Sequence, residues 1–153
     1  MSRRRVPRTH AERKIGLMVE ETPSRKHHWL WFGLAVVIAV ADQLSKYAAL
    51  LYLELHRPVP LIPTLDLMLT YNTGAAFSFL SDAGGWQRWF FTVLASVVTL
   101  VLVVWILRLP STEKLTAASL CLIIGGAVGN LVDRINHGYV VDFIDVHVSG
   151  WHW

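Results

Sequence analysis

The chain has 153 residues, enough for one domain, and it is 54% hydrophobic but only 16% charged. Soluble domains usually carry about a quarter charged residues, so this composition argues against a soluble protein and for a membrane protein. The net charge is +3, yet eight of the 14 Lys and Arg residues lie before Trp29. A basic tail followed directly by an apolar run fits the positive-inside rule better than a nucleic-acid-binding face.

Residues 1–28 are polar and basic and lack a clear periodicity, which predicts a mostly disordered cytoplasmic tail, and residues 29–153 form the membrane-embedded domain. The apolar run 29–41 is interrupted by Asp42 and Lys46 and then resumes through Leu53. Together these residues supply the ~20 positions that a membrane span requires. The alternative is a secretory signal peptide, because residues 39–41 resemble a cleavage site; the long preceding tail and the apolar residues that follow favour a span.

The segment 54–85 is expected to be a structured loop at the membrane surface. Three prolines at 58, 60 and 63 break any helix, and residues 65–70 partly alternate between apolar and polar, as a half-buried strand does. Residues 72–74 and 82–85 are turn signals.

Two further uncharged runs, 89–107 and 115–132, predict a second and a third membrane helix. The loop between them contains Arg108 and Lys114, so the positive-inside rule places it in the cytoplasm together with the basic tail. The segments 54–85 and 133–153 then lie on the outer face. A strand-like pattern is present at 139–148.

Acidic side chains gather toward this outer face. Charged residues in membrane segments are costly and usually functional. Asp42 and Lys46 lie at the outer end of the first helix, and Asp133, Asp142 and Asp145 follow the outer end of the third. Polar residues from distant parts of the sequence thus converge at one depth, which suggests a site.

The outer end of the third helix has a distinct polar pattern. Asn130, Asp133 and Arg134 share one helix face if the helix continues; the alternative is an ion pair with a capping Asn that ends the helix. The nearby glycines at 125, 126 and 129 permit close approach of a helix or a ligand, and ordinary helix packing is the better interpretation from the residues alone.

Asp142 is flanked on both sides by apolar residues, which makes it a candidate functional acid, and the alternative is an exposed position on an edge strand. Histidines 137, 147 and 152 match no standard zinc spacing, so no metal site is expected.

Four segments resemble, in order and spacing, the motifs of one protein family: DQLSK at 42–46, YNTGAAFS at 71–78, GGAVGNLVDR at 125–134 and GYVVDFI at 138–144. Together they resemble the lipoprotein signal peptidases, the type II signal peptidases of bacteria. The resemblance extends from about Trp29 to Trp153.

The resemblance implies a mainly α, multi-pass enzyme of the bacterial inner membrane, with four helices, both termini in the cytoplasm, and a small β-rich cradle and a helix on the periplasmic face. It implies an aspartic endopeptidase whose substrate is a diacylglyceryl-modified prolipoprotein, cut just before the lipidated cysteine near the periplasmic face. Membrane lipid is the other expected partner. We expect a monomer that binds no nucleic acid.

The implied chemistry uses two aspartates and neither a metal nor another cofactor. Asp142 matches the first catalytic aspartate. Other positions match residues that line or support the substrate site, namely Asn72, Gly74, Asn130 and Arg134. Asp42 and Lys46 match a structural polar pair, and Asp133 matches a supporting acid.

The second catalytic aspartate of the family lies in a Phe-Asn-x-Ala-Asp motif that opens the fourth helix, and this motif should begin a few residues after Trp153. We therefore expect the sequence to be incomplete at its C-terminus and the chain as given to be inactive. Asp145 is a poor substitute, because it is three residues from Asp142 on a strand and would point to the opposite face.

Two other classes stay open at this point. A small transporter or channel subunit would use Asp42, Arg134 and Asp142 as an ion path, with these groups spread through the membrane. A non-catalytic lipid-binding scaffold would not require Asp142.

Overall fold

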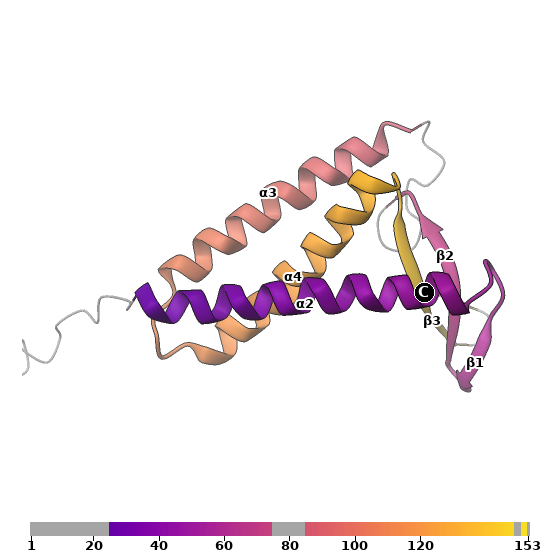
Figure 1. Cartoon of the computed structure of the whole chain (residues 1–153), viewed down its shortest axis with the longest axis horizontal. Helices are drawn as coiled ribbons and strands as arrows, with labels where there is room; N and C mark the ends of the chain where they lie inside the picture. Colours follow the sequence, from indigo (N-terminus) through magenta and orange to yellow (C-terminus); the bar gives the residue numbers. More distant parts are fainter. Residues whose placement is uncertain (1–24, 75–84, 149–150, 153) are drawn as a thin grey trace, which may run out of the picture.

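The computed structural model describes residues 25–74, 85–148 and 151–152. These residues form three long helices and a small sheet (Figure 1). The helices are α2 (Arg25–Tyr52), α3 (Gln87–Arg108) and α4 (Lys114–Asn136). The strands are β1 (Val59–Ile62), β2 (Leu65–Asn72), β3 (Val140–Val148) and β4 (Trp151–His152).

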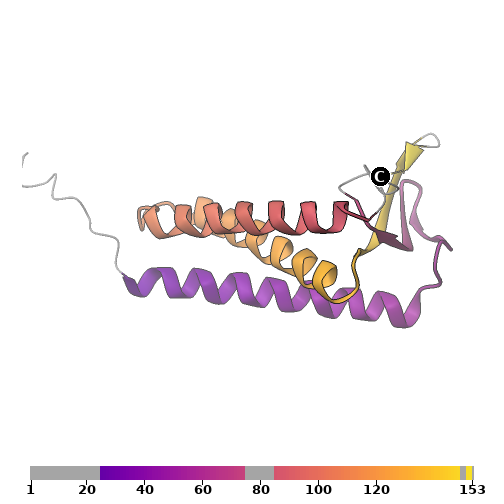
Figure 2. The ribbon, with the colours of Figure 1, turned by 90° about the horizontal axis from the view of Figure 1, so that it is seen from above.

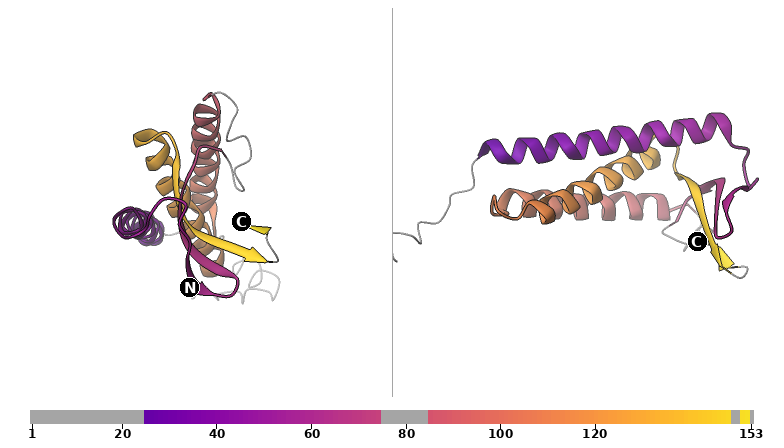
Figure 3. Two further views of the ribbon diagram at one scale, coloured as in Figure 1. Left: turned by 90° about the vertical axis from the view of Figure 1, so that its right-hand side faces the viewer. Right: turned by 90° about the horizontal axis from the view of Figure 1, so that it is seen from below.

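The helices lie side by side, and the sheet is at the end where α2 and α4 finish and α3 begins (Figures 1 and 2). The start of α2 and the loop between α3 and α4 are at the opposite end. The basic loop and the polar segments therefore lie at opposite ends of the helices, as the sequence predicted. The end that carries the sheet is the one predicted to face outward, and it is called the outer end below. This arrangement is visible again from below and along the bundle in Figure 3.

Each helix is long and apolar enough to cross a membrane, which confirms the three predicted spans. Two boundaries differ from the prediction by four residues, and the others by one or two. The first helix begins at Arg25, so the last residues of the predicted tail, 25–28, are helical; residues 1–24 lie outside the described part of the chain. The third helix continues past Val132 to Asn136, because the charges of Asp133 and Arg134 find partners there.

The bundle core lies where α4 packs against α2 and α3. Its buried side chains are small or aliphatic: Ala35, Ile106, Leu120, Cys121 and Ile124. Large apolar residues on the outward surfaces stay exposed, as Leu100 does with 65% of its surface. Such a surface suits contact with lipid, where apolar side chains cost nothing to expose.

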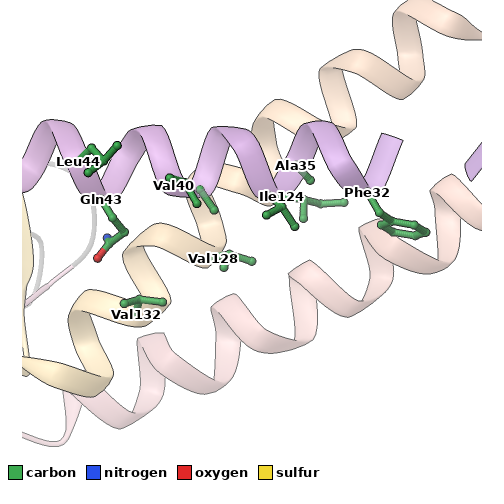
Figure 4. A pocket seen from close by; sticks show the side chains of 10 residues that line it. Phe32, Ala35, Val40, Gln43, Leu44, Ile124, Val128 and Val132 are labelled. Atoms are coloured by element: carbon green, nitrogen blue, oxygen red, sulfur yellow. The ribbon is translucent and has the colours of Figure 1, made fainter. Parts of the chain in front are cut away.

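An apolar groove runs along the bundle between α2 and α4 (Figure 4). Phe32, Val40 and Leu44 line it from α2, and Ile124, Val128 and Val132 line it from α4. The amide of Gln43 is the polar group among its lining side chains and lies at the outer end.

The sheet is antiparallel with the strand order β1-β2-β3-β4. Both predicted strands, at 65–70 and 139–148, are present as β2 and β3. Pro60 lies in β1, an edge strand, where the missing N–H group of proline is tolerated. The sheet packs against the outer end of α2 through Ala49, Leu69 and Val141.

Part of the predicted surface loop lies outside the described residues. These include 82–84 of the predicted turn at 82–85. The expected outer-face helix is not formed by residues 54–74, which contain β1 and β2, and it stays a prediction for the residues that follow.

The close approach of α2 and α4 depends on Gly125. A Cβ atom there would lie 2.5 Å from Ile38 Cγ2 and 2.9 Å from the Ala35 carbonyl oxygen, whereas a Cβ at Gly126 would meet nothing within 4 Å. The packing interpretation of these glycines is therefore confirmed for Gly125.

We predict that Gly125→Ala lowers the free energy of unfolding by about 1–3 kcal/mol relative to Gly126→Ala, because the extra methyl group overpacks the helix contact. The matched control removes the effect of helix propensity, which favours Ala at both positions. The measurement is reversible unfolding in detergent micelles. Equal stabilities of the two variants would contradict this view of the helix contact.

Candidate active site

A buried ion cluster joins α2 to α4 at the outer end of the bundle. Lys46 Nζ lies 2.8 Å from Asp133 Oδ2 and 2.9 Å from Asp42 Oδ2, and it donates to Asn130 Oδ1 at 2.7 Å. The Lys46 and Asp133 side chains are only 7% and 3% exposed. The predicted convergence of charged residues from distant segments is therefore confirmed for this group.

Gln43 completes the cluster and was not predicted as a site residue. Its Nε2 atom donates to Asp133 Oδ1 at 2.9 Å and to the Gly129 carbonyl oxygen at 3.1 Å. The helical spacing contained a signal, because residues three apart such as Gln43 and Lys46 share a helix face. Gly129 allows this close contact, since a Cβ atom there would overlap the Asp42 carboxylate, which would have to shift.

Asp133 also holds the strand that follows its helix. Its Oδ2 atom accepts a hydrogen bond of 3.2 Å from the backbone N–H of Val141. The carboxylate is thus engaged by an ammonium group, an amide and a backbone donor at once. This arrangement fixes Val141, the residue before Asp142, relative to both membrane helices.

The helix continues through Asn130, so the alternative in which this residue caps a helix end is wrong. Asn130 and Asp133 turn toward Lys46 on α2. Arg134 turns the other way: its Nη2 atom donates to the Gly74 carbonyl oxygen at 3.1 Å, and its guanidinium lies 5.7 Å from the ring centre of Phe91 on α3. Neighbouring residues of α4 therefore bind two different parts of the chain, namely α2 and the turn after β2.

Asp142 lies beside the chain that leaves β2. Its Oδ2 atom accepts from Asn72 Nδ2 at 3.0 Å, and Asn72 Oδ1 accepts from the Gly74 N–H at 2.9 Å. The guanidinium of Arg134 attracts the carboxylates of Asp142 and Asp133. Asn72, Gly74, Arg134 and Asp142 are thus brought together from β2, its following turn, α4 and β3.

The sheet register gives Asp142 its direction. Asp142 is paired with Thr70 of β2 and is half-buried, so the exposed position of the alternative interpretation is wrong. β4 pairs with β3 only at His147 and Val148, so β2 is the strand that adjoins Asp142. Asp145 is paired with Asp66, and both are buried. Because side chains alternate along a strand, Asp145 points to the other face, as predicted.

The arrangement can hold and polarise a carbonyl group next to a carboxylate. Asp142 supplies an acid–base group, and Asn72 holds it in place. The buried Arg134 guanidinium has an Nε hydrogen without a hydrogen-bond partner among residues 25–74, 85–148 and 151–152. A buried donor of this kind is costly unless it finds an acceptor, which a bound peptide can provide. In the same part of the chain, no three His, Cys, Asp or Glu side chains are placed to hold a metal ion.

Comparison with known proteins gives a consistent picture. The profile of the signal peptidase (SPase) II family matches residues 34–153. The lipoprotein signal peptidase of Acinetobacter baumannii (strain ATCC 17978) is 50% identical over 127 residues, which cover 83% of this chain and 72% of that protein. The lipoprotein signal peptidase of Coxiella burnetii (strain Dugway 5J108-111) is 46% identical over 132 residues, which cover 86% of this chain and 81% of the relative.

A solved bacterial membrane enzyme has the same fold. It superimposes with a TM-score of 0.68 at 28% identity, over 80% of this chain and 73% of its own. A second solved bacterial membrane enzyme gives a TM-score of 0.65, also at 28% identity.

The ion cluster yields a test of stability. We predict that Asp133→Asn lowers the free energy of unfolding by about 3 kcal/mol, because it removes one of the two carboxylates that neutralise the buried Lys46 charge. The control is Glu54→Gln. It removes a 2.6 Å pair with Arg57 whose side chains are both 72% exposed, and such pairs contribute about 0–1 kcal/mol. Denaturant titration in micelles would measure the free energy of unfolding of both variants. Equal decreases would contradict the prediction that the buried ion pair stabilises the fold more than the exposed one.

Proposed function

This chain belongs to the signal peptidase II family of aspartic peptidases, and we propose that it removes signal peptides from diacylglyceryl-modified prolipoproteins by cutting just before the lipidated cysteine. The observation that carries the proposal is the meeting of Asp142 with Asn72, Gly74 and Arg134 at the outer end of three membrane helices.

In the proposed mechanism, Asp142 is one of two carboxylates that share a proton. Two carboxylates close together cannot both ionise easily, so one stays protonated while the other acts as a base. The base takes a proton from water, and the resulting hydroxide attacks the scissile carbonyl carbon. The protonated partner polarises the carbonyl oxygen. As the C–N bond breaks, a proton passes to the leaving amine and the free carboxylic acid is released.

The second carboxylate comes, in this proposal, from outside residues 25–74, 85–148 and 151–152. Asp133 is occupied by Lys46, Gln43 and the Val141 N–H, and it is better suited to support than to proton transfer. Asp145 lies on the other face of the sheet.

The remaining matched residues have supporting roles in the proposed site. Asn72 orients Asp142, and its Oδ1 atom fixes the turn at Gly74. Arg134 holds the Gly74 carbonyl and presents its unused Nε hydrogen to the peptide. Asp42, Lys46 and Asn130, with Asp133, keep α2 and α4 in register below the site.

The position of the site suits such a substrate. Its lipid stays in the bilayer while its scissile peptide bond must meet water. The Arg108–Lys114 loop lies at the end opposite to the site, so the positive-inside rule places that loop in the cytoplasm and the site near the periplasmic face of the inner membrane. A transporter would distribute Asp42, Arg134 and Asp142 through the membrane, but these residues gather at one end, and this favours the peptidase.

The catalytic role of Asp142 can be tested in a chain that extends through the second aspartate motif and the helix after it. We expect Asp142→Asn to lower the rate of prolipoprotein cleavage by about 10²–10⁴-fold, because an amide can neither act as a base nor carry the shared proton. Binding of the lipid-modified substrate should be largely retained. The matched control, Asp145→Asn, changes the same chemistry on the opposite face of β3 and should keep most activity. Turnover near the parent rate in Asp142→Asn would rule out the aspartic mechanism at this residue.

The need for a second carboxylate gives a separate test. A polypeptide of residues 1–153 should not cleave a diacylglyceryl-modified prolipoprotein in detergent or lipid, since an unpaired Asp142 lacks an acid partner. The same polypeptide continued by a Phe-Asn-x-Ala-Asp segment and its helix should cleave it. Robust cleavage by residues 1–153 alone would mean that their own side chains complete the site.

A further inference from the structure

Arg88, near the start of α3, contacts the end of α4 rather than the ion cluster or Asp142. Its Nε atom donates to the Arg134 carbonyl oxygen at 2.9 Å, and its Nη2 atom donates to the Ile135 carbonyl oxygen at 2.8 Å. The side chain is half-buried. One guanidinium therefore serves two consecutive carbonyl groups in the last turn of a membrane helix.

The last four carbonyls of an α-helix have no intrahelical donor, so each needs a partner from outside the helix or gains from an additional one. They also form the negative end of the helix dipole, where a cation is favourable. At a membrane boundary, unsatisfied backbone groups are costly. The planar fork of an arginine side chain can bind two acceptors at once in a fixed geometry, which a lysine ammonium group cannot reproduce.

The turn after α4 closes directly on Arg88. The N–H groups of His137 and Gly138 donate to the carbonyls of Asp133 and Arg134 at 2.8 and 3.1 Å, so the Arg134 carbonyl accepts from both Gly138 and Arg88. Gly138 has φ +87°, a conformation that side chains rarely adopt, and a Cβ atom there would lie 3.3 Å from Arg88 Nη1. The turn is thus held between its own hydrogen bonds and the Arg88 guanidinium.

This turn leads into the strand that carries Asp142. β3 begins at Val140, two residues after Gly138, and the Val141 N–H is held by Asp133. The Arg134 side chain, whose backbone Arg88 binds, donates to Gly74 on the other side of the site. A shift of the turn would therefore move Asp142 and the Arg134 guanidinium together.

We propose that Arg88 is a positioning residue for the peptidase site: it clamps the end of α4 and so fixes the turn that directs Asp142 and Arg134 toward the substrate. The inference rests on the proposed function of that site. A simpler role for Arg88 is an interfacial anchor, because its guanidinium also lies 5.1 Å from the ring centre of Trp89. An anchor needs only a positive charge, whereas the clamp needs the two-donor fork.

The experiment compares Arg88→Gln and Arg88→Lys with the control Arg108→Gln, which removes a charge from the other end of the same helix. All are made in the cleavage-competent enzyme. Steady-state cleavage of a diacylglyceryl-modified prolipoprotein gives kcat and KM, and amide hydrogen exchange reports on residues 137–141. We expect Arg88→Gln to lower kcat by about 10–100-fold with little change in KM, since small misplacements of reacting groups have costs of this order.

Arg88→Gln should also speed hydrogen exchange in residues 137–141. Arg88→Lys should fold, restore kcat only in part and show intermediate exchange, so the proposal stays testable if the Gln variant fails to fold. Arg108→Gln should match the parent in every readout. If Arg88→Lys keeps the parental kcat and the parental hydrogen exchange, the positioning role is wrong and Arg88 is an interfacial anchor. Unchanged hydrogen exchange in Arg88→Gln would contradict the positioning role in the same way.

Failure of the inference is distinguishable from failure of the proposed function. If Asp142→Asn abolishes cleavage while both Arg88 variants keep parental kcat and exchange, the inference alone fails. If Asp142→Asn cleaves at the parent rate, the proposed function fails, and the Arg88 variants can no longer be positioning a catalytic Asp142.

Discussion

The buried contact between Lys46 and Asp133 is the interaction on which the outer end of the molecule depends. A charge inside a membrane protein is tolerated when it meets a partner and its other hydrogen-bonding groups are satisfied. Both conditions hold here, because Asn130 and Asp42 accept from Lys46 and Gln43 donates to Asp133. The pair can form only if α2 and α4 approach closely, and a Cβ atom at Gly125 or Gly129 would collide with α2 at this contact.

The same contact also positions the sheet. Asp133 binds the Val141 N–H, and the alternation of β3 then directs Asp142 away from the face that packs on Ala49 of α2. Asn72, the last residue of β2, meets Asp142 there. A polar contact between two membrane helices thus determines where the Asp142 carboxylate lies at the outer end of the bundle.

Much of this could be predicted from the sequence, and the omissions have physical causes. The uncharged runs correctly predicted the membrane-spanning helices, because the length and hydropathy of a helix depend only on its own stretch of sequence. Alternation correctly placed Asp145 on the face opposite to Asp142. The end of α4 was predicted too early, since Asp133 and Arg134 look like helix-ending charges until their partners from α2 and the Gly74 turn are known. Arg88 was missed because its partners are backbone carbonyls of α4, for which a sequence gives no signal. Gln43 was missed although its spacing from Lys46 placed both on one helix face, because an uncharged amide does not stand out in a membrane helix as a charge does.

The most direct test of this account replaces both members of the buried pair, as Lys46→Met with Asp133→Leu, in the cleavage-competent enzyme. Replacing a buried ion pair by apolar residues of similar size is often neutral for stability, whereas removing one member is costly. The account predicts that the double variant unfolds with a free energy closer to the parent than either single variant does. Its cleavage should nevertheless stay low, because the Val141 N–H has lost the acceptor that positions Asp142. Parental cleavage by a stable double variant would contradict the claim that this pair positions the site.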